Sequence, residues 1–341
     1  MRIAAYSSFT FAYLGRARVL AETLKAHNPD WDLVAIITDR PPAGMEFSAA
    51  AEPFDRIVWY DELDVPDILS WIFKHDVVEV CTAVKGHALV KLLEEGYDRV
   101  FYLDPDIAVF SPLDSLVEMH ETASVTLTPH QLTPEESLFG ILDNEIGSLK
   151  YGIYNLGYVG VSNDKDGRAF ARWWADRLQE YCFDDIPMGL FTDQRWCDLA
   201  PALFDNVRII RDPGYNVASW NLSGRHISFD DKGSLRANGS ILRFFHFTKM
   251  GPLGRRMTSR YGWSSPAVFE LWRWYEDRHE ELAPKDVPKG YWYFGLYEDG
   301  GPVNKSDRAT YRVRLDLQLA FPDPFRSYSG SYRQWQLDGN R

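Results

Sequence analysis

Two carboxylates, Asp104 and Asp106, flank a proline directly after an apolar stretch, Arg99–Leu103. Residues at i and i+2 of an extended segment project to the same side, so both carboxylates can face one point. Two carboxylates held close together repel one another, and a divalent cation relieves that repulsion. Oxygen ligands suit Mg²⁺ or Mn²⁺, which keep coordination positions open for substrate phosphates. The pair therefore predicts a metal site, and the alternative is an ordinary turn whose Asp side chains bond local backbone amides.

A histidine and a basic segment follow near residue 250. His246 lies in a second apolar stretch, Arg243–Phe247, where a lone histidine is more often a structural residue. The next residues, Thr248–Arg260, contain no acid but include four cations, namely Lys249, Arg255, Arg256 and Arg260. Glycines in this segment let backbone amides approach a phosphate, and the cations neutralise it. We interpret the segment as a phosphate-binding loop, with a solvated basic loop as the alternative.

The composition limits the class of protein. The 341 residues suffice for one large α/β domain with additions or for two modest domains. A net charge of −12 argues against a nucleic-acid partner. Three widely spaced cysteines without a C-x-x-C pair argue against a disulfide framework or standard zinc site and favour a reducing cytoplasm. Without a long apolar stretch, we expect neither a signal peptide nor a membrane span.

The elements that must position these residues alternate between strand and helix patterns over residues 1–110, which predicts an open, mostly parallel sheet. We predict strands over 2–6, 32–38, 56–60, 99–103, 123–127, 154–161 and 243–247. We predict helices over 12–27, 77–95, 166–181 and 265–281. From about residue 283 the chain is rich in Gly, Pro and Tyr, and we predict a separate appendage of short strands and loops without chemistry.

Four stretches, in this order along the chain, resemble motifs of glycosyltransferase family eight and related bacterial retaining enzymes of the GT-A fold. Phe101–Asp106 resembles the D-x-D motif, whose aspartates bind the metal and the donor diphosphate. Tyr154–Val159 resembles the Asn-x-Gly strand, and Phe191–Gln194 resembles the Asp-Gln pair. His246–Lys249 resembles the closing His motif, which implies that the His is the third metal ligand and the Lys binds phosphate.

The resemblance implies further site residues. It gives Asn155 a contact with the donor sugar and places Asp193 and Gln194 beside the sugar and its anomeric carbon. It places the loop that contains Ser7 and Tyr13 where the family holds the base and ribose. It places Lys85 near the donor, and the alternative interpretation of Lys85 is a solvated cation on a helix. The family's spacing after the His is not kept here. The phosphate contact could therefore be made by Arg255 or Arg256 in place of Lys249.

These features lead to one expectation for the fold. We predict an α/β protein of GT-A type, with a Rossmann-like mixed sheet flanked by helices. Residues 1–282 would form the glycosyltransferase domain, with a nucleotide-binding half over about 1–110 and a sugar and acceptor half over about 111–282. Residues 283–341 would form the C-terminal appendage.

The expected function is metal-dependent, retaining transfer of a sugar from a nucleotide-diphosphate donor to a hydroxyl of a glycan or lipid-linked acceptor, with Mn²⁺ or Mg²⁺ as cofactor. A UDP-hexose donor is suggested by analogy. The preferred route is same-face attack assisted by the leaving phosphate, and Asp193 as a nucleophile is less favoured. The expected location is the cytoplasm, with peripheral contact at the inner face of the membrane, and no particular oligomeric state is predicted.

Two other functions compete with this expectation. A nucleotidyltransferase acting on sugar phosphates also joins an α/β sheet to paired aspartates. It would need a Gly-rich basic loop after the first strand, and Ser7–Ala12 offers none. A non-catalytic glycan-binding protein would be expected to lack one metal ligand, yet all three candidates are present.

Overall fold

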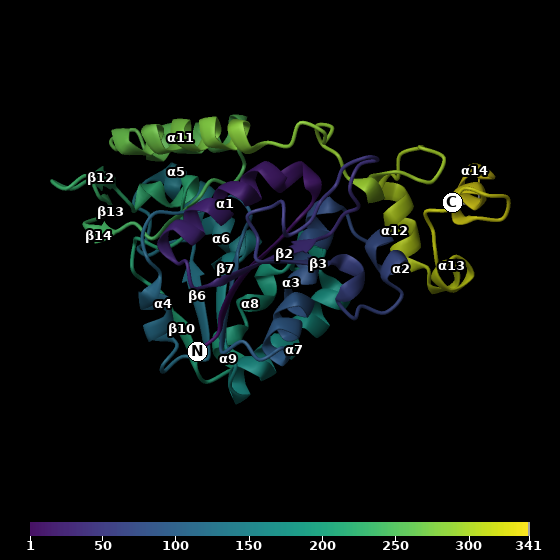
Figure 1. The fold of residues 1–341 in the computed structure, drawn as a ribbon, viewed down its shortest axis with the longest axis horizontal. Helices are drawn as coiled ribbons and strands as arrows, with labels where there is room; N and C mark the ends of the chain where they lie inside the picture. The colour runs from purple at the N-terminus through teal and green to yellow at the C-terminus, as the bar shows by residue number, and fades with distance from the viewer. Residues whose placement is uncertain (340–341) are drawn as a thin grey trace.

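Seven strands form the central sheet of the computed structural model, which describes residues 1–339 (Figure 1). Their order across the sheet is β10-β6-β7-β4-β1-β2-β3. The bounds are β1 (Ile3–Phe9), β2 (Asp32–Ile37), β3 (Arg56–Trp59), β4 (Arg99–Leu103), β6 (Val125–Pro129), β7 (Tyr154–Ser162) and β10 (Val207–Ile209). Strands β4, β1, β2 and β3 are parallel, whereas β7 runs antiparallel to both β4 and β6. The mixed sheet confirms the predicted α/β class.

Helices cover both faces of this sheet because its strands alternate their side chains between two apolar cores. In β4, Val100 and Tyr102 belong to the core under α3 and α7, and Phe101 and Leu103 to the core under α1. The helix Val77–Glu94 begins at Asp76, whose carboxylate caps two backbone amides. The helices that flank the sheet are α1 (Leu14–His27), α3 (Val77–Glu94), α4 (Asp114–Met119) and α7 (Lys165–Tyr181).

A small sheet, in the order β11-β15-β5, lies where the chain leaves β4. Its strands are β11 (Val217–Ala218), β15 (Phe244–His246) and β5 (Ile107–Val109). The helix α11 (Pro266–Leu282) packs against this sheet. The remaining short strands are β8 (Asp184–Asp185), β9 (Leu190–Phe191), β12 (Ile227–Phe229), β13 (Leu235–Ala237) and β14 (Ser240–Ile241).

The other helical segments are short. They are η1 (Phe11–Tyr13), η2 (Tyr60–Glu62), α2 (Ile68–Phe73), α5 (Leu138–Gly140), η3 (Ile141–Glu145), α6 (Ile146–Tyr151), η4 (Ile186–Met188), α8 (Gln194–Cys197), α9 (Ala200–Leu203), η5 (Ser219–Ser223), α10 (Pro252–Tyr261), η6 (Tyr293–Gly295), α12 (Lys305–Val313), α13 (Leu315–Ala320) and α14 (Tyr332–Leu337). Within residues 1–339, no helix is both long and apolar enough to cross a membrane.

Two sequence predictions about secondary structure are wrong. The basic segment after His246 is not a loop throughout, because Pro252 starts the helix α10, and proline is tolerated in a first helical turn. The C-terminal residues are not short strands and loops. Within residues 283–339, apart from one isolated β-bridge between Leu296 and Pro302, the regular structure is helical, in η6, α12, α13 and α14.

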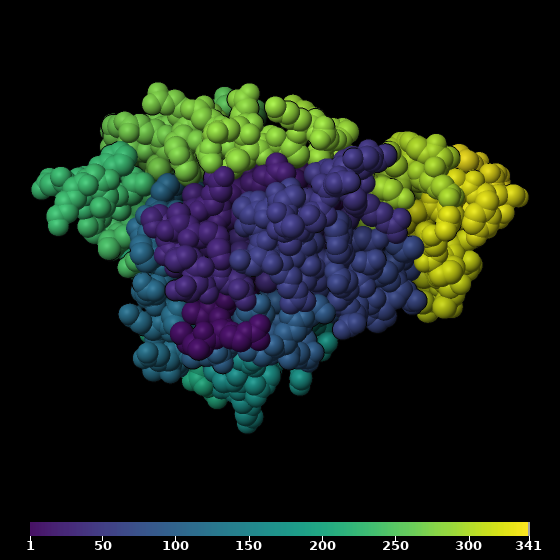
Figure 2. All heavy atoms as spheres, in the orientation of Figure 1, coloured from purple at the N-terminus to yellow at the C-terminus, as the bar shows by residue number. Residues whose placement is uncertain are grey.

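The C-terminal residues share a core with the main sheet. The rings of Tyr311, Phe325 and Tyr332 each lie with their centroids between 5.0 and 5.4 Å from that of Phe73 in α2. Arg308 is buried and donates to the backbone carbonyls of Phe73 and His75. In the space-filling view these residues form a projection at one end of the molecule, against residues of α2 (Figure 2).

Candidate metal centre and donor pocket

The turn Asp104-Pro105-Asp106 joins the large sheet to the small one. The amide of Asp104 donates to Gly157 O at 2.9 Å, which ties the turn to β7, and Ile107 N donates to Asp104 O at 3.0 Å. Strand β5 begins at Ile107 and pairs antiparallel with β15, so that His246 lies opposite Ile107. The amide of Phe247 then donates to Asp106 O at 2.8 Å. This pairing brings residue 246 next to residues 104–106.

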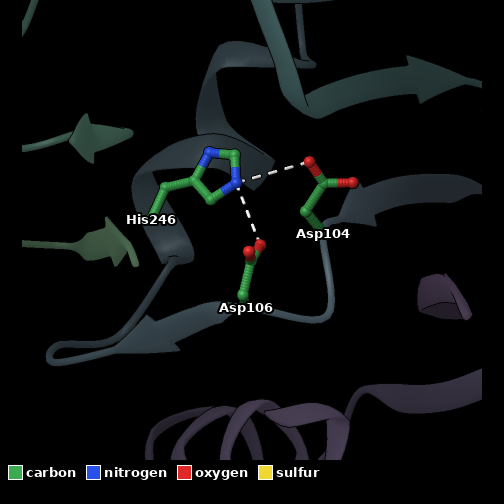
Figure 3. A group of neighbouring side chains, drawn as sticks. All are labelled: Asp104, Asp106 and His246. Atoms are coloured by element: carbon green, nitrogen blue, oxygen red, sulfur yellow. Dashed lines mark ion pairs between the residues drawn. The ribbon is translucent and has the colours of Figure 1, made fainter. Parts of the chain in front are cut away.

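Asp104, Asp106 and His246 converge on one point, as the sequence predicts (Figure 3). His246 Nε2 lies 3.0 Å from Asp106 Oδ1 and 3.4 Å from Asp104 Oδ2. One ligand atom from each residue lies within 4.8 Å of the other two. Asp106 and His246 are buried, and Asp104 is half-buried. Two carboxylates and one imidazole form a donor set that fits a divalent cation with positions left for substrate oxygens.

The charges at this point favour a cation. Burial disfavours ionisation of Asp106, but His246 and Arg16 outweigh it and hold the pKa of Asp106 below its ordinary value. Burial also disfavours the charged form of His246, which by itself would lower its pKa. The charges of Asp106 and Asp104 outweigh burial, so the pKa of His246 is raised. The two carboxylates thus create a negative field that favours a positive charge at this point and would attract a metal ion.

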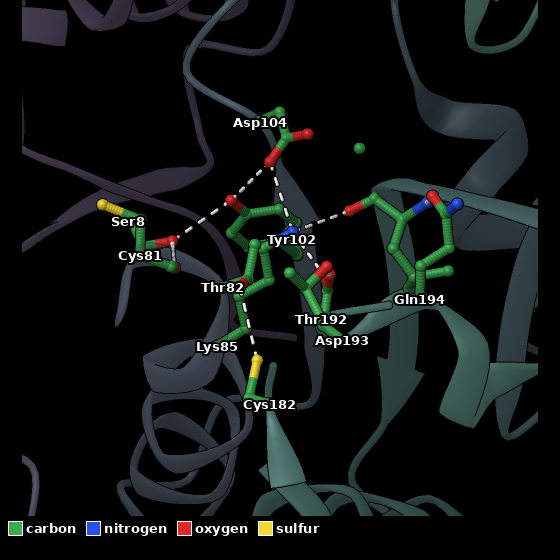
Figure 4. Close-up of polar contacts among 12 residues, drawn as sticks. Ser8, Cys81, Thr82, Lys85, Tyr102, Asp104, Cys182, Thr192, Asp193 and Gln194 are labelled. Atoms are coloured by element: carbon green, nitrogen blue, oxygen red, sulfur yellow. Dashed lines mark hydrogen bonds and ion pairs between the residues drawn. The ribbon is translucent and has the colours of Figure 1, made fainter. Parts of the chain in front are cut away.

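Lys85 lies between Asp104 and Asp193, so the alternative of a solvated helix cation is wrong (Figure 4). Its side chain is 2% exposed, and its Nζ lies 2.8 Å from Asp193 Oδ2 and 3.3 Å from Asp104 Oδ1. It also donates to Leu156 O at 3.0 Å and lies 4.1 Å from the ring centroid of Tyr102. Burial lowers the pKa of Lys85, but the two carboxylates outweigh it and raise the pKa to about 12, so the ammonium stays charged.

Asp193 and Gln194 are both held by other groups of the protein. Besides Lys85 at Oδ2, Asp193 accepts a hydrogen bond at Oδ1 from Thr192 Oγ1 at 3.0 Å. The Gln194 amide donates to Tyr151 O at 2.9 Å and accepts from Leu156 N at 3.2 Å. The structure thus brings Asp193 to the metal centre through Lys85, and it bonds the Gln194 amide to backbone. Their roles toward a sugar stay predictions.

Asn155 lies beside the metal centre with a free donor. Its Oδ1 accepts from Gly157 N at 3.0 Å, while its buried Nδ2 has no partner among residues 1–339. Gly157 is in turn so close to the imidazole that an added Cβ would lie 2.5 Å from His246 Nδ1. A buried amide donor without a partner is uncommon, and a ligand hydroxyl would satisfy it.

A row of side chains leads from Asp106 to a pocket at the end of β1. Arg16 Nη1 lies 3.7 Å from Asp106 Oδ2, and the Arg16 guanidinium lies 4.2 Å from the ring centroid of Tyr13. Tyr13 lines a pocket of about 850 Å³. Ser7, within β1, has a buried hydroxyl without a partner in the described chain. The opposite wall comes from residues 290–298 and 323–326 of the C-terminal segment. No role at the site was predicted for that segment.

Asp39 and Arg40 are site residues that the sequence analysis missed. Asp39 follows β2, and its carboxylate accepts hydrogen bonds from Phe11 N, Arg40 N and Tyr293 N at 3.3, 2.9 and 2.8 Å. Burial raises the pKa of Asp39 to about 7, although these amides oppose the shift. Asp39 follows the buried strand next to β1, and parallel neighbouring strands end at the same sheet edge. Its position directly after a buried strand could therefore have identified Asp39 as a candidate site residue from the sequence.

The cations of the basic segment are less closely placed. Arg255 pairs with Glu276 of α11 at 2.8 Å, and Arg260 pairs with Asp143. Lys249 is exposed and has a φ of +55°, and Arg256 is exposed on α10. Within the described chain, no ion pair joins these cations to the metal centre. Phosphate contacts by Lys249, Arg255 or Arg256 stay predictions.

Comparison with known proteins adds relatives without an assigned activity. No family model matches the chain. It is 29% identical over 178 residues to the uncharacterized protein YfnF of Bacillus subtilis (strain 168), covering 51% of this chain and 57% of that protein. It is 23% identical over 235 residues to the uncharacterized protein YfnD of the same organism, covering 67% of this chain and 72% of YfnD. The chain thus spans just over half the length of YfnF.

Solved structures with a similar arrangement include two glycosyltransferases. One is the galactosyltransferase LgtC in complex with donor and acceptor sugar analogs, with 16% identity, a TM-score of 0.47 and coverage of 84% of this chain and 98% of that one. The other is mouse xyloside xylosyltransferase 1, with 12% identity, a TM-score of 0.39 and coverage of 74% and 98%.

Proposed function

We propose that this chain is a metal-dependent glycosyltransferase that moves a sugar from a nucleotide-diphosphate donor to an acceptor hydroxyl. The observation that carries the proposal is the convergence of Asp104, Asp106 and His246 at the end of β4. Arg16 links this point to the ring of Tyr13, which lines a pocket. Ligands of open α/β sheets bind at this edge, outside the carboxyl ends of the strands. A chain with a net charge of −12 needs such a cation to bind a diphosphate.

The three ligands would hold Mn²⁺ or Mg²⁺, which when bound neutralises the diphosphate and withdraws charge from the leaving group. Arg16 lies next to Asp106 and adds a positive charge beside the metal ligands. Lys85 keeps Asp104 in place, because it holds the Asp104 and Asp193 carboxylates together. Lys249, with Arg255 or Arg256, would add phosphate contacts once a donor is bound.

The pocket beside Tyr13 would take the nucleoside. The Tyr13 side chain lines this pocket and offers a ring for stacking on a base. Ser7, in the preceding strand β1, has a buried hydroxyl without a partner in the described chain. Asp39 orders the backbone at the pocket's rim. A UDP-hexose is our proposed donor by analogy with the sequence motifs.

The sugar would lie between the metal centre and Asn155, whose unpartnered Nδ2 would donate to a sugar hydroxyl. We propose retention by same-face attack, assisted by the leaving phosphate. Asp193 is poorly suited as a nucleophile, because Lys85 and Thr192 each hold one of its oxygens. The acceptor would be a glycan or a lipid-linked oligosaccharide in the cytoplasm, with the enzyme at the inner face of the membrane.

A donor screen tests this proposal. The purified protein is incubated with several nucleotide sugars and Mn²⁺, and slow donor hydrolysis is followed as nucleotide release. We expect one donor to be hydrolysed, chelation to stop the reaction and added Mn²⁺ to restore it. Asp104→Asn is expected to lower the rate by about 100-fold or more, because it removes a charged ligand. Asp316→Asn, an exposed aspartate of α13, is the matched control.

Two results would point to the rival functions. Pyrophosphate release from a nucleoside triphosphate and a sugar phosphate, without hydrolysis of any nucleotide sugar, would identify a nucleotidyltransferase. Glycan binding without turnover of any donor, unaffected by Asp104→Asn, would identify a glycan-binding protein.

A further inference from the structure

The segment from α5 to α6 is an amphipathic helix whose polar residues face the protein. Asn144 is buried, and its Nδ2 donates to Glu135 Oε1 at 2.7 Å and to Ser223 Oγ at 3.2 Å. Asp143 Oδ2 accepts from Tyr261 Oη at 2.9 Å and pairs with Arg260. Glu145 accepts from the amide of Glu135 at 2.8 Å. These bonds turn the polar side of the helix inward.

The apolar residues of the same segment face solvent. The exposed side chains recur three or four residues apart, which places them along one side of the helix. Their exposed fractions run from 47% at Ile146 to 71% at Leu149. We call this surface the apolar face, and its members are Leu138, Phe139, Leu142, Ile146 and Leu149. A contiguous apolar surface of this kind marks an interaction site.

Further hydrogen bonds hold the end of the helix in this orientation. Arg195 donates to Leu149 O at 2.7 Å, and Gln194 donates to Tyr151 O at 2.9 Å. The amide of Ile153 donates to Asp198 at 2.7 Å. The helix is therefore anchored through its backbone to the side chains of Gln194, Arg195 and Asp198.

Cationic side chains lie next to the apolar face, although Arg260 is paired with Asp143. The Arg260 guanidinium lies 4.9 Å from the ring centroid of Phe139, and Lys150 Nζ lies 4.9 Å from that of Tyr151. Arg256 is exposed one turn before Arg260 on α10. The acids of η3 point inward, and among residues 137–153 the exposed charged side chain is Lys150. Glu136 precedes this segment and is exposed.

We propose that the apolar face docks onto an anionic lipid surface, with its leucines inserted among the headgroups and Lys150, Arg256 and Arg260 at its rim. An interfacial helix binds through this combination of exposed apolar side chains and adjacent cations. The charges oppose a second copy of the chain as the occupant, because a symmetric pairing would bring the two cationic rims together. The proposal goes beyond the proposed activity, and its test does not depend on sugar transfer.

Vesicle flotation tests the proposal. The full chain is mixed with vesicles of phosphatidylcholine alone or of phosphatidylcholine with phosphatidylglycerol, and the fraction that floats is measured. We expect the wild type to float with the anionic vesicles. The double variant Leu142→Ser/Leu149→Ser is expected to lower binding by about tenfold or more, because it removes inserted apolar area. The matched control is Leu315→Ser/Leu319→Ser on α13, where both leucines are also exposed.

A second variant separates charge from apolar contact. Lys150→Glu keeps the apolar face intact and is expected to weaken binding to anionic vesicles, and added salt is expected to weaken wild-type binding. Thermal unfolding of each variant checks that it is folded. The proposal is overturned if the wild type stays in the aqueous fraction with both vesicle types, or if the control loses as much binding as the test variant. It is also overturned if light scattering shows a wild-type dimer that Leu142→Ser/Leu149→Ser converts to monomer, since the occupant would then be a second copy.

Discussion

Lys85 is the counter-charge of the buried Asp193 carboxylate, and it also pairs with the half-buried Asp104. Its Nζ lies 2.8 Å from Asp193 and 3.3 Å from Asp104. Removing one partner of a buried ion pair costs about 3–5 kcal/mol, because the other charge is left uncompensated. We therefore expect Lys85→Met to lower the free energy of unfolding by about that amount, as measured by urea denaturation.

A double variant distinguishes an uncompensated charge from lost packing. Lys85→Met/Asp193→Asn is expected to recover part of the loss, because the buried negative charge is removed together with its partner. If the double variant is as unstable as the sum of the two single variants, the two side chains do not interact energetically and the assigned role of Lys85 is wrong.

Asp39 makes a pH dependence predictable. Its pKa in the folded protein is about 7, above the ordinary value of 3.8 in an unfolded chain. The folded state thus holds a proton that the unfolded state releases, so the stabilisation from this group is full below about pH 4 and is lost as the pH rises to about 7. Each pH unit in that window contributes up to about 1.4 kcal/mol.

We expect Asp39→Asn to remove this decline. The urea midpoint of the wild type should fall relative to that of the variant between about pH 5 and about pH 8, by the equivalent of about 2–3 kcal/mol. Asp184→Asn, at an exposed aspartate, should follow the wild type. Parallel curves for the wild type and Asp39→Asn would show that Asp39 titrates normally.

The residue types at the metal centre were predictable, whereas several neighbours were not. Asp104 and Asp106 stand together in the sequence after a buried strand, and their chemistry follows from that position. Arg16 and Asp39 lie on separate elements. From the sequence alone, Arg16 could be an ordinary surface charge and Asp39 an ordinary turn residue. Only the strand order, with β1 between β4 and β2, brings them to one sheet edge.

At the scale of elements, strand β7 makes room for the His246 imidazole because it has a glycine, Gly157, at the point of contact. A Cβ at Gly157 would lie 2.5 Å from His246 Cε1 and Nδ1. The imidazole is buried, so Gly157→Ala should displace it from the two carboxylates while leaving every proposed ligand in the chain. We expect Mn²⁺ affinity, measured by calorimetric titration, to fall by about 10- to 100-fold, which is the usual effect of disturbing a ligand's support.

Gly147→Ala is the matched control, because a Cβ at Gly147 meets nothing within 4 Å. It should bind Mn²⁺ like the wild type. Unchanged Mn²⁺ affinity in a folded Gly157→Ala protein would mean that His246 does not ligate the ion.

The elements themselves were predictable where apolar runs are buried and capped. Strands β2, β4 and β7 lie within one residue of the predicted ranges, because their apolar content is fixed by two covered faces. Strand β1 extends three residues past its predicted end, to Phe9. The helix α12 was missed although Asn304 and Asp307 form a capping box at its start. Its Gly- and Pro-rich surroundings concealed it, and its packing on α2 became visible only in the structure.

At the scale of the whole molecule, the C-terminal segment covers α2 and lines the pocket that contains Tyr13. Arg308 places its guanidinium against the carbonyls of Phe73 and His75, at 3.1 and 2.8 Å, where the short helix α2 ends. The predicted boundary at residue 282 therefore separates two parts that share apolar and polar contacts. That contact was not readable from sequence, because Tyr-rich composition suits a loop as well as a core.

Removal of residues 283–341 should therefore do more than shorten the protein. It would expose the Phe73 ring, now packed among Tyr311, Phe325 and Tyr332, and leave the α2 carbonyls without the Arg308 donor. Each large apolar side chain returned to water costs about 1.5–3 kcal/mol, and a chain's total stability is only about 5–15 kcal/mol. We expect the truncated chain to aggregate or to unfold without a cooperative transition in differential scanning calorimetry.

Tyr328→Ala, at a largely exposed position of the same segment, should unfold like the wild type. A truncated chain that stays soluble and unfolds cooperatively at the wild-type temperature would instead establish residues 1–282 as an independent domain, with the C-terminal segment attached to it only weakly.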